Sequence, residues 1–154
     1  MQRYGDPLEK GIRYTTRPGA YAVLVRGGQM LLTRQFQPLD EFQLPGGGID
    51  AGEGPLRALH REVKEETGYS IRVTARLGVY QKYVFMPEYD LWARKVCHIY
   101  LGRPVLRMGP PTEPGHEPVW MDLDTATEAL ANDADAEIAR QALGILPAYP
   151  RRAG

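Results

Sequence analysis

The sequence predicts an α/β or α+β fold in which helices cover a mixed β-sheet. Three features of this chain of 154 residues lead to that class: early apolar runs typical of strands, a central segment with helical periodicity, and later runs rich in Val, Ile and Tyr. An Ala-rich, amphipathic segment follows them near the C-terminus. Because the length suits one hydrophobic core, we expect a single domain over 1–154.

The first two strands are expected at 20–25 and 30–33, two apolar runs separated by Gly27 and Gly28. A glycine pair between apolar runs is a strong hairpin signal. The stretch 35–48 is dense in Pro, Asp and Gly, and we expect it to be a loop.

A helix is expected at 55–67. Pro55 suits its first turn and Gly68 suits its C-cap. Three apolar residues at helical spacing are expected to face the core: Leu56, Leu59 and Val63.

Beyond this helix, alternating composition indicates further strands and two short helices. The helices are expected within 124–143, with a break near Asn132, whose side chain suits an N-cap. The polar start, 1–13, is expected to be an extension and 147–154 a loose tail. Further strands are expected at 70–83, 95–101 and 118–122, with a loop at 86–90.

The composition narrows the kinds of partner. Lys plus Arg and Asp plus Glu both number 19, so we expect neither a nucleic-acid polymer nor a membrane as partner. The N-terminus lacks the pattern of a signal or transit peptide, which indicates a cytoplasmic protein. Cys97, the single cysteine, is expected to be a small buried hydrophobe.

Three carboxylates gather on the predicted helix. At 100° per residue, Glu62 and Glu66 are adjacent on one face and Glu65 lies about 60° farther round. Like charges at this spacing oppose helix formation unless a cation lies between them. Carboxylates without His or Cys suit Mg²⁺ or Mn²⁺. The alternative is a solvated face balanced by neighbouring Arg and Lys side chains.

Three glycines precede this helix. Gly46, Gly47 and Gly48 would let the backbone approach an anion or a metal without obstruction by Cβ. Together with the carboxylates they indicate phosphate chemistry, in which a metal activates a water and a carboxylate accepts its proton.

The segment from Gly47 to Tyr69 resembles the Nudix box, G-x5-E-x7-R-E-U-x-E-E-x-G-U, where U is bulky and apolar. Val63 fills the first U, and Tyr69 departs mildly from the usual aliphatic residue at the last. The resemblance implies a Nudix-type α/β/α sandwich with a mixed central sheet. Every fixed position is met: Gly47, Glu53, Arg61, Glu62, Glu65, Glu66 and Gly68.

The same resemblance implies roles for these residues. Glu62 and Glu66 would be the principal metal ligands, joined by the backbone carbonyl of Gly47. Glu65 would be a further ligand or the general base, and Arg61 would orient the carboxylates.

Two later glutamates are also candidates for the base, since the resemblance leaves this role open. Glu113 and Glu117 lie in a Pro-rich loop before Trp120, and His116 between them is expected to be a surface residue. The candidate substrate-binding residues are Gly46, Gly48, Arg34, Phe85 and Tyr89, the two rings being placed to stack on a base.

The predicted activity is metal-dependent hydrolysis of a pyrophosphate bond in a nucleoside diphosphate linked to another group. The substrate would be a small nucleotide-type molecule, and the enzyme a monomer or homodimer. Two alternatives remain open: a Nudix-fold module that binds a nucleotide without cleaving it, and an isomerase on the same scaffold.

Overall fold

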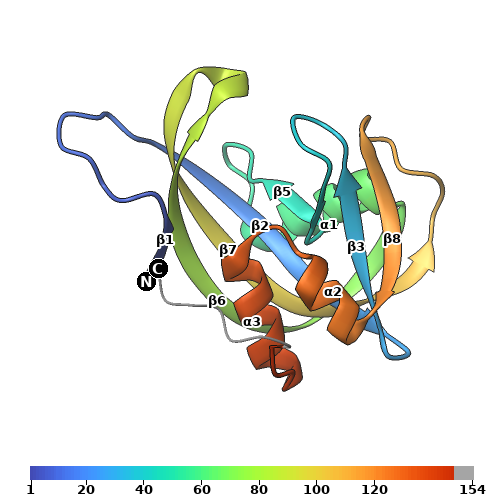
Figure 1. Ribbon diagram of the computed structural model, residues 1–154. Helices are drawn as coiled ribbons and strands as arrows, with labels where there is room; N and C mark the ends of the chain where they lie inside the picture. The colour runs from blue at the N-terminus through green and yellow to red at the C-terminus, as the bar shows by residue number, and fades with distance from the viewer. Residues whose placement is uncertain (148–154) are drawn as a thin grey trace.

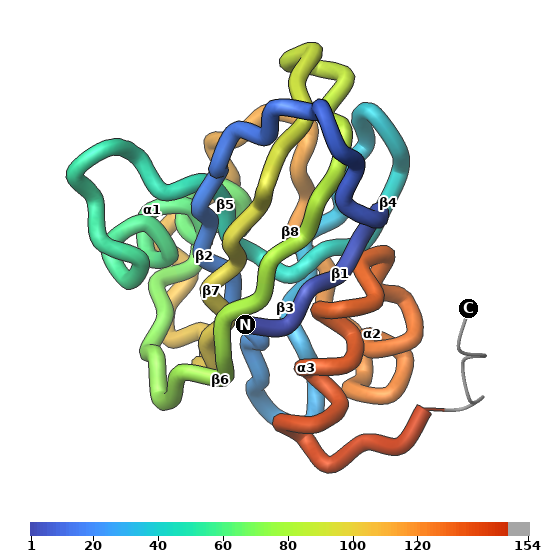
Figure 2. Tube along the Cα trace, turned by 90° about the vertical axis from the view of Figure 1, so that its left-hand side faces the viewer, coloured from blue at the N-terminus to red at the C-terminus, as the bar shows by residue number. Residues whose placement is uncertain are grey.

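A mixed β-sheet separates helix α1 (Pro55–Thr67) from helices α2 (Leu123–Ala129) and α3 (Asp133–Leu143). Figures 1 and 2 show α1 on one side of the strands and the other two helices on the opposite side. The computed structural model describes residues 1–147. The strands are β1 (Gln2–Gly5), β2 (Thr15–Arg26), β3 (Gln29–Gln35), β4 (Glu41–Gln43), β5 (Gly46–Gly48), β6 (Tyr69–Met86), β7 (Leu91–Arg107) and β8 (His116–Asp122).

The strand order across the sheet is β1-β6-β7-β2-β3-β4, with β5 paired to β2 and β8 paired to β3. The pairs β1/β6 and β2/β7 are parallel, whereas the other pairs are antiparallel. The mixed sheet predicted from the sequence is thereby confirmed.

Each face of the sheet carries its own hydrophobic core, because successive side chains of a strand point to opposite faces. Leu31 of β3 packs toward α1 with Leu59 and Val63. Its neighbour Leu32 packs with the residues of α2 and α3, among them Ala136.

Helix α1 has the predicted bounds and cap, but one residue of its predicted core face is exposed. Gly68 ends the helix in the left-handed region at φ 79°. Leu59 and Val63 are fully buried, whereas Leu56 is 48% exposed. Leu56 lies in the first turn, so the start of α1 extends past the packed face of the sheet.

Three strands occur where none was predicted. β4 and β5 lie inside the stretch 35–48 expected to be a loop, and β1 lies inside the expected extension 1–13. Such short strands depend on their partners: β5 pairs with β2 and β1 with β6. The predicted tail, apart from Pro147, lies outside the described residues.

β6 and β7 are longer than predicted and form a hairpin that projects from the sheet (Figures 1 and 2). A short 3-10 turn, η1 (Pro87–Tyr89), closes it where a loop was expected. Tyr14, from the segment after β1, packs edge-on against Tyr83 and Trp92 of the hairpin. None of the helices in residues 1–147 has the length and apolarity needed to span a bilayer.

Candidate functional site

Glu66 is the most buried carboxylate of the site, with its side chain only 5% exposed. Its Oε1 accepts a hydrogen bond of 2.8 Å from the backbone N–H of Gly46, and its Oε2 lies 3.0 Å from Nδ1 of His116. Burial raises the pKa of Glu66, and the two hydrogen bonds oppose that rise. Glu66 is therefore held against the start of β5 and against His116.

His116 corrects the expectation of a surface histidine. Its side chain is 15% exposed, and Nδ1 also lies 3.2 Å from the hydroxyl of Thr33, which is fully buried. The hydrogen bond to Glu66 raises the pKa of His116. The sequence carries no signal for this position, because His116 was expected in a loop and its partners Glu66 and Thr33 come from distant parts of the chain.

Glu62 lies against the backbone of Gly47. A Cβ added to Gly47 would lie 2.5 Å from the carboxyl carbon and from Oε2 of Glu62, so only glycine leaves room for this carboxylate. Partial burial raises the pKa of Glu62, and the negative charges of Glu66 and Glu65 add to the rise, whereas Arg61 lowers it. Glu62 is thus a carboxylate held close to two others and to the glycine backbone.

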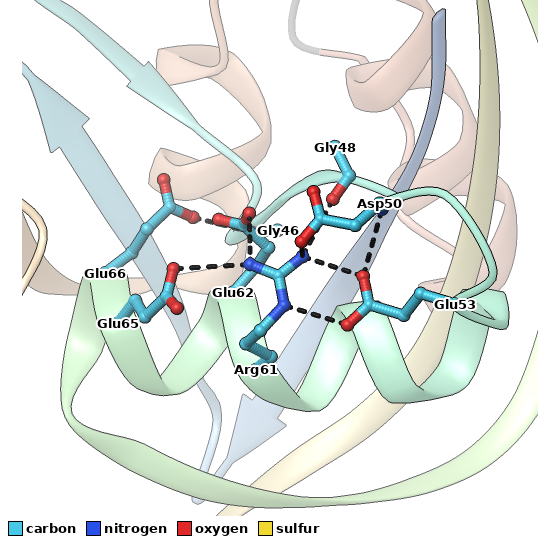
Figure 3. A network of polar contacts seen from close by, with 8 residues as sticks. All are labelled: Gly46, Gly48, Asp50, Glu53, Arg61, Glu62, Glu65 and Glu66. Carbon is cyan, nitrogen blue, oxygen red and sulfur yellow. Dashed lines mark hydrogen bonds and ion pairs between the residues drawn. The ribbon is translucent and has the colours of Figure 1, made fainter.

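Arg61 connects the carboxylates to the loop before α1 (Figure 3). It donates two hydrogen bonds to Glu53, and through Nη1 it donates one of 2.9 Å to Oε1 of Glu62. Nη1 also lies 3.5 Å from Oε2 of Glu65, and Nη2 donates to the carbonyl of Gly48 at 3.1 Å. The guanidinium therefore contacts the side chains that the box brings together, and the orienting role predicted for Arg61 stays a prediction.

Glu53 is held as an anion by this network. Hydrogen bonds from Arg61, and a further one of 3.1 Å from the backbone N–H of Asp50, lower the pKa of Glu53 to about 2. Both of its oxygens are occupied by Arg61, which supports a positioning role for Glu53.

The loop between β7 and β8 is attached to the end of α1. The backbone N–H groups of Thr112 and Glu113 both donate to the carbonyl of Glu65, at 2.8 and 2.9 Å. The negative charge of Glu113 contributes to the raised pKa values of Glu66 and His116. Glu113 is therefore close to the box glutamates.

Glu117 and Arg34 do not join this site. They are register partners on β8 and β3, and each is next in sequence to a residue that faces α1: His116 beside Glu117 and Thr33 beside Arg34. Alternation places Glu117 and Arg34 on the opposite face of the sheet. Arg34 donates hydrogen bonds of 2.8 and 2.7 Å to Asp40 there. Glu117 and Arg34 therefore lie across the sheet from the box carboxylates, and the roles predicted for them, general base and substrate binding, stay predictions.

The two aromatic candidates lie in or next to the hairpin turn. The ring of Phe85 packs against Trp92 at 5.2 Å between centroids, and Arg17 lies 4.6 Å above the ring of Tyr89.

Cys97 is 3% exposed and burial raises its pKa, as expected for a buried hydrophobe.

The donor set fits a hard divalent cation. Glu62, Glu65 and Glu66 offer oxygen atoms from one face of α1, and their mutual repulsion would be relieved by a cation. In the described part of the chain, no three His, Cys, Asp or Glu side chains are already gathered as a preformed metal site.

The chain is similar in sequence to a family model and to characterised hydrolases. A family model described as NUDIX domain matches residues 15–142. The CMP-5'-(N-acetyl-N-hydroxy-3-aminopropyl)phosphonate hydrolase of Streptomyces rubellomurinus is 32% identical over 133 residues, which are 82% of this chain and 61% of that protein. An RNA pyrophosphohydrolase of Ruthia magnifica is 42% identical over 66 residues, 41% of this chain and 36% of that protein.

The fold is also that of solved structures. A MutT NUDIX hydrolase from Burkholderia pseudomallei has a TM-score of 0.63 and 26% identity, with 82% of this chain and 97% of that chain covered. The matched segments span less than two thirds of the length of the two relatives compared by sequence. The α/β/α sandwich expected from the box is confirmed by the structure and by this likeness.

Proposed function

The chain belongs to the NUDIX family, and from this premise we propose that it hydrolyses a pyrophosphate bond in a nucleoside diphosphate linked to another group, with a divalent metal. The observation that carries the proposal is the convergence of Glu62 and Glu66 on the glycine backbone of β5. Of the two relatives compared above, one is named as the hydrolase of a CMP-linked phosphonate and the other as an RNA pyrophosphohydrolase.

In this proposal Glu62, Glu66 and the backbone carbonyl of Gly47 hold Mg²⁺ or Mn²⁺, and Glu65 is available as a further ligand. When bound, the metal would neutralise phosphate charge and make a water molecule easier to deprotonate. The chain itself supplies the orientation: Arg61 fixes Glu62, and the Gly46 N–H and His116 fix Glu66. Fixed second contacts of this kind strengthen metal sites in proteins.

The general base is assigned to Glu65 or Glu113. Glu113 replaces Glu117 as the candidate from the loop, because its backbone is bonded to the carbonyl of Glu65 and its charge acts on Glu66. A base outside the metal shell should lower kcat when neutralised and leave metal affinity unchanged. Measuring kcat and Mg²⁺ dependence for Glu65→Gln and Glu113→Gln separates the two roles. Neutralising a metal ligand should lower both kcat and Mg²⁺ affinity, whereas neutralising the base should lower kcat alone.

The test of the function is a product screen with Mg²⁺ or Mn²⁺ over nucleoside triphosphates, dinucleotides, nucleotide sugars, ADP-ribose and RNA with a 5'-triphosphate. Chromatography of the products identifies the bond that is cleaved. We expect Glu62→Gln to lower kcat by several orders of magnitude without lowering the melting temperature. Glu9→Gln, an exposed change outside the site, is the matched control.

Turnover that persists without metal would contradict the proposal, as would a fully active Glu62→Gln enzyme. Nucleotide binding without any cleavage would point instead to a binding module.

A further inference from the structure

Both carboxylate oxygens of Glu66 are held by donors from the sheet. Oε1 accepts a hydrogen bond of 2.8 Å from the backbone N–H of Gly46 at the start of β5 (Figure 3). Oε2 lies 3.0 Å from Nδ1 of His116 at the start of β8. Because β5 pairs with β2 and β8 pairs with β3, the two donors hold the carboxylate at separate points of the sheet.

Glu66 differs in this respect from the other two box glutamates. Oε1 of Glu62 accepts a hydrogen bond of 2.9 Å from Arg61, and Oε2 of Glu65 lies 3.5 Å from the same guanidinium. Within residues 1–147, the second oxygen of each makes no hydrogen bond. The side chains of Glu62 and Glu65 are 18% and 35% exposed, against 5% for Glu66. Glu66 is therefore the carboxylate with the least freedom to turn.

His116 is itself held in place. An ionised carboxylate only accepts hydrogen bonds, so Nδ1 of His116 is the donor to Glu66. The hydroxyl oxygen of Thr33, a fully buried residue of β3, lies 3.2 Å from the same nitrogen. The backbone just before the histidine is fixed as well, because the N–H of Phe36 donates to the carbonyl of Gly115 at 3.2 Å. The ring therefore cannot turn away from Glu66 without losing a second contact.

Mg²⁺ and Ca²⁺ use carboxylates differently. Mg²⁺ demands near-octahedral geometry and keeps several waters, whereas Ca²⁺ takes about six to eight oxygen ligands at longer distances, often two from one carboxylate. To give both oxygens to one ion, Glu66 would have to turn, and turning would break its bond to His116 or to Gly46. The two donors thus favour the ion that needs a single oxygen from Glu66.

We propose that His116 is a positioning residue that selects the metal: by holding Oε2 of Glu66, it favours Mg²⁺ over the larger Ca²⁺. The inference rests on the proposed function, which makes Glu66 a metal ligand. His116 acts through Glu66, since the nitrogen that faces the carboxylate carries a proton and does not bind a metal. Thr33 supports it by holding the ring. Without His116, the carboxylate is free to pivot about its bond to Gly46 and to offer both oxygens.

Competition for Mn²⁺ tests the inference without substrate and without hydrolysis. Binding of Mn²⁺ to the metal-free protein is followed by electron paramagnetic resonance of the free ion, and Mg²⁺ or Ca²⁺ is added as the competitor. The measured quantity is the ratio of the Kd for Ca²⁺ to the Kd for Mg²⁺. Glu66→Gln shows which part of the binding depends on this carboxylate.

His116→Ala removes the donor and should lower that ratio by about tenfold or more, within the range by which outer contacts alter metal sites. His116→Asn keeps an N–H donor near the position of Nδ1 and should restore most of the wild-type ratio. His60→Ala, the same change at an exposed position of α1, is the matched control and should leave the ratio unchanged.

Thr33→Val is the second variant, and it decides the question if the thermal melt shows that His116→Ala does not fold. The change removes the hydroxyl beside Nδ1 and keeps a branched side chain of similar shape. It should lower the ratio in the same direction as His116→Ala, because the ring is then less constrained.

A wild-type ratio in His116→Ala would overturn the inference, and an unchanged ratio in Thr33→Val would overturn it if His116→Ala does not fold. Equal loss of affinity for both ions in His116→Ala, or a His116→Asn protein as impaired as His116→Ala, would show a merely structural role and would overturn it too.

These outcomes are distinct from failure of the proposed function. An enzyme that cleaves its substrate and has the same metal preference in every variant loses only the inference about His116. Metal selection that depends on His116 without any cleavage loses only the hydrolase. A wild-type protein that binds no Mn²⁺ would contradict both.

Discussion

Arg61 and Glu53 face each other through two parallel hydrogen bonds, from Nε to Oε2 at 2.9 Å and from Nη2 to Oε1 at 2.8 Å. The planar guanidinium reaches Glu62 and the Gly48 carbonyl at the same time. Lysine cannot reproduce this fork. Arg61→Lys should therefore lower kcat and Mg²⁺ affinity by about 10- to 100-fold, the usual effect of losing an outer contact of a metal site. Arg57→Lys, an exposed change on the same helix, should leave both unchanged; equal activity of the two variants would exclude the positioning role.

The contact between Gly47 and Glu62 predicts a sharp difference between neighbouring glycines. A Cβ on Gly47 would displace the Glu62 carboxylate, whereas a Cβ on Gly48 would meet nothing within 4 Å. We expect Gly47→Ala to lower kcat by at least about tenfold, since misplacing a reacting group by about 1 Å can cost far more. Gly48→Ala should retain most of the activity. Steady-state kinetics and thermal melts of the two proteins test this, and the idea fails if Gly48→Ala is the more damaged enzyme.

The packed face of α1 predicts a graded effect on stability. Leu59→Ala or Val63→Ala should lower the free energy of unfolding by about 1 to 4 kcal/mol, because both side chains are fully buried. Leu56→Ala should change it by less than about 0.5 kcal/mol, as expected for an exposed position. Urea denaturation of the three variants gives the comparison. A large loss of unfolding free energy in Leu56→Ala would mean that the Leu56 side chain is buried in solution.

The buried carboxyl of Asp135 predicts a dependence of stability on pH. Its pKa is raised from 3.8 to about 6, so the folded protein binds the proton more tightly than the unfolded chain. The stability contributed by the protonated acid is fully present below pH 3.8 and is lost as the pH rises through 6. Asp135→Asn does not titrate, so its stability relative to the wild type should increase between pH 4 and pH 7 by on the order of 3 kcal/mol.

Urea denaturation at several pH values measures this difference. Asp124→Asn, with an exposed carboxyl, should show a nearly constant difference from the wild type over the same range. A constant difference for Asp135→Asn as well would show that its carboxyl is not buried in solution.

The sequence was most informative where local rules apply. The bounds of α1 followed from Pro55, Gly68 and the spacing of apolar residues, and the box identified the carboxylates that the structure brings together. The short strands β4 and β5 could not be predicted, because they are defined by pairing with β3 and β2 and contain few strand-forming residues.

The residues that were missed or misplaced owe their positions to tertiary contacts. His116 faces α1 and Glu117 the other side, a one-residue distinction that depends on the register of β8 against β3. Nothing in the sequence pattern marks Asp135, in the first turn of α3, as buried. Its burial arises because α3 packs over Tyr80 of β6, 55 residues earlier in the chain.

The glycine that closes the box has a second reason to be glycine besides its φ of 79°. A Cβ on Gly68 would lie 2.0 Å from the backbone carbonyl oxygen of Gly109, in the loop that carries Glu113. One letter of a short local motif thus encodes a long-range contact with a segment some forty positions later. If the box helix were transplanted into another scaffold, its metal-binding residues would be kept. Gly68 would, however, lose the contact with the Gly109 carbonyl that leaves no room for a Cβ.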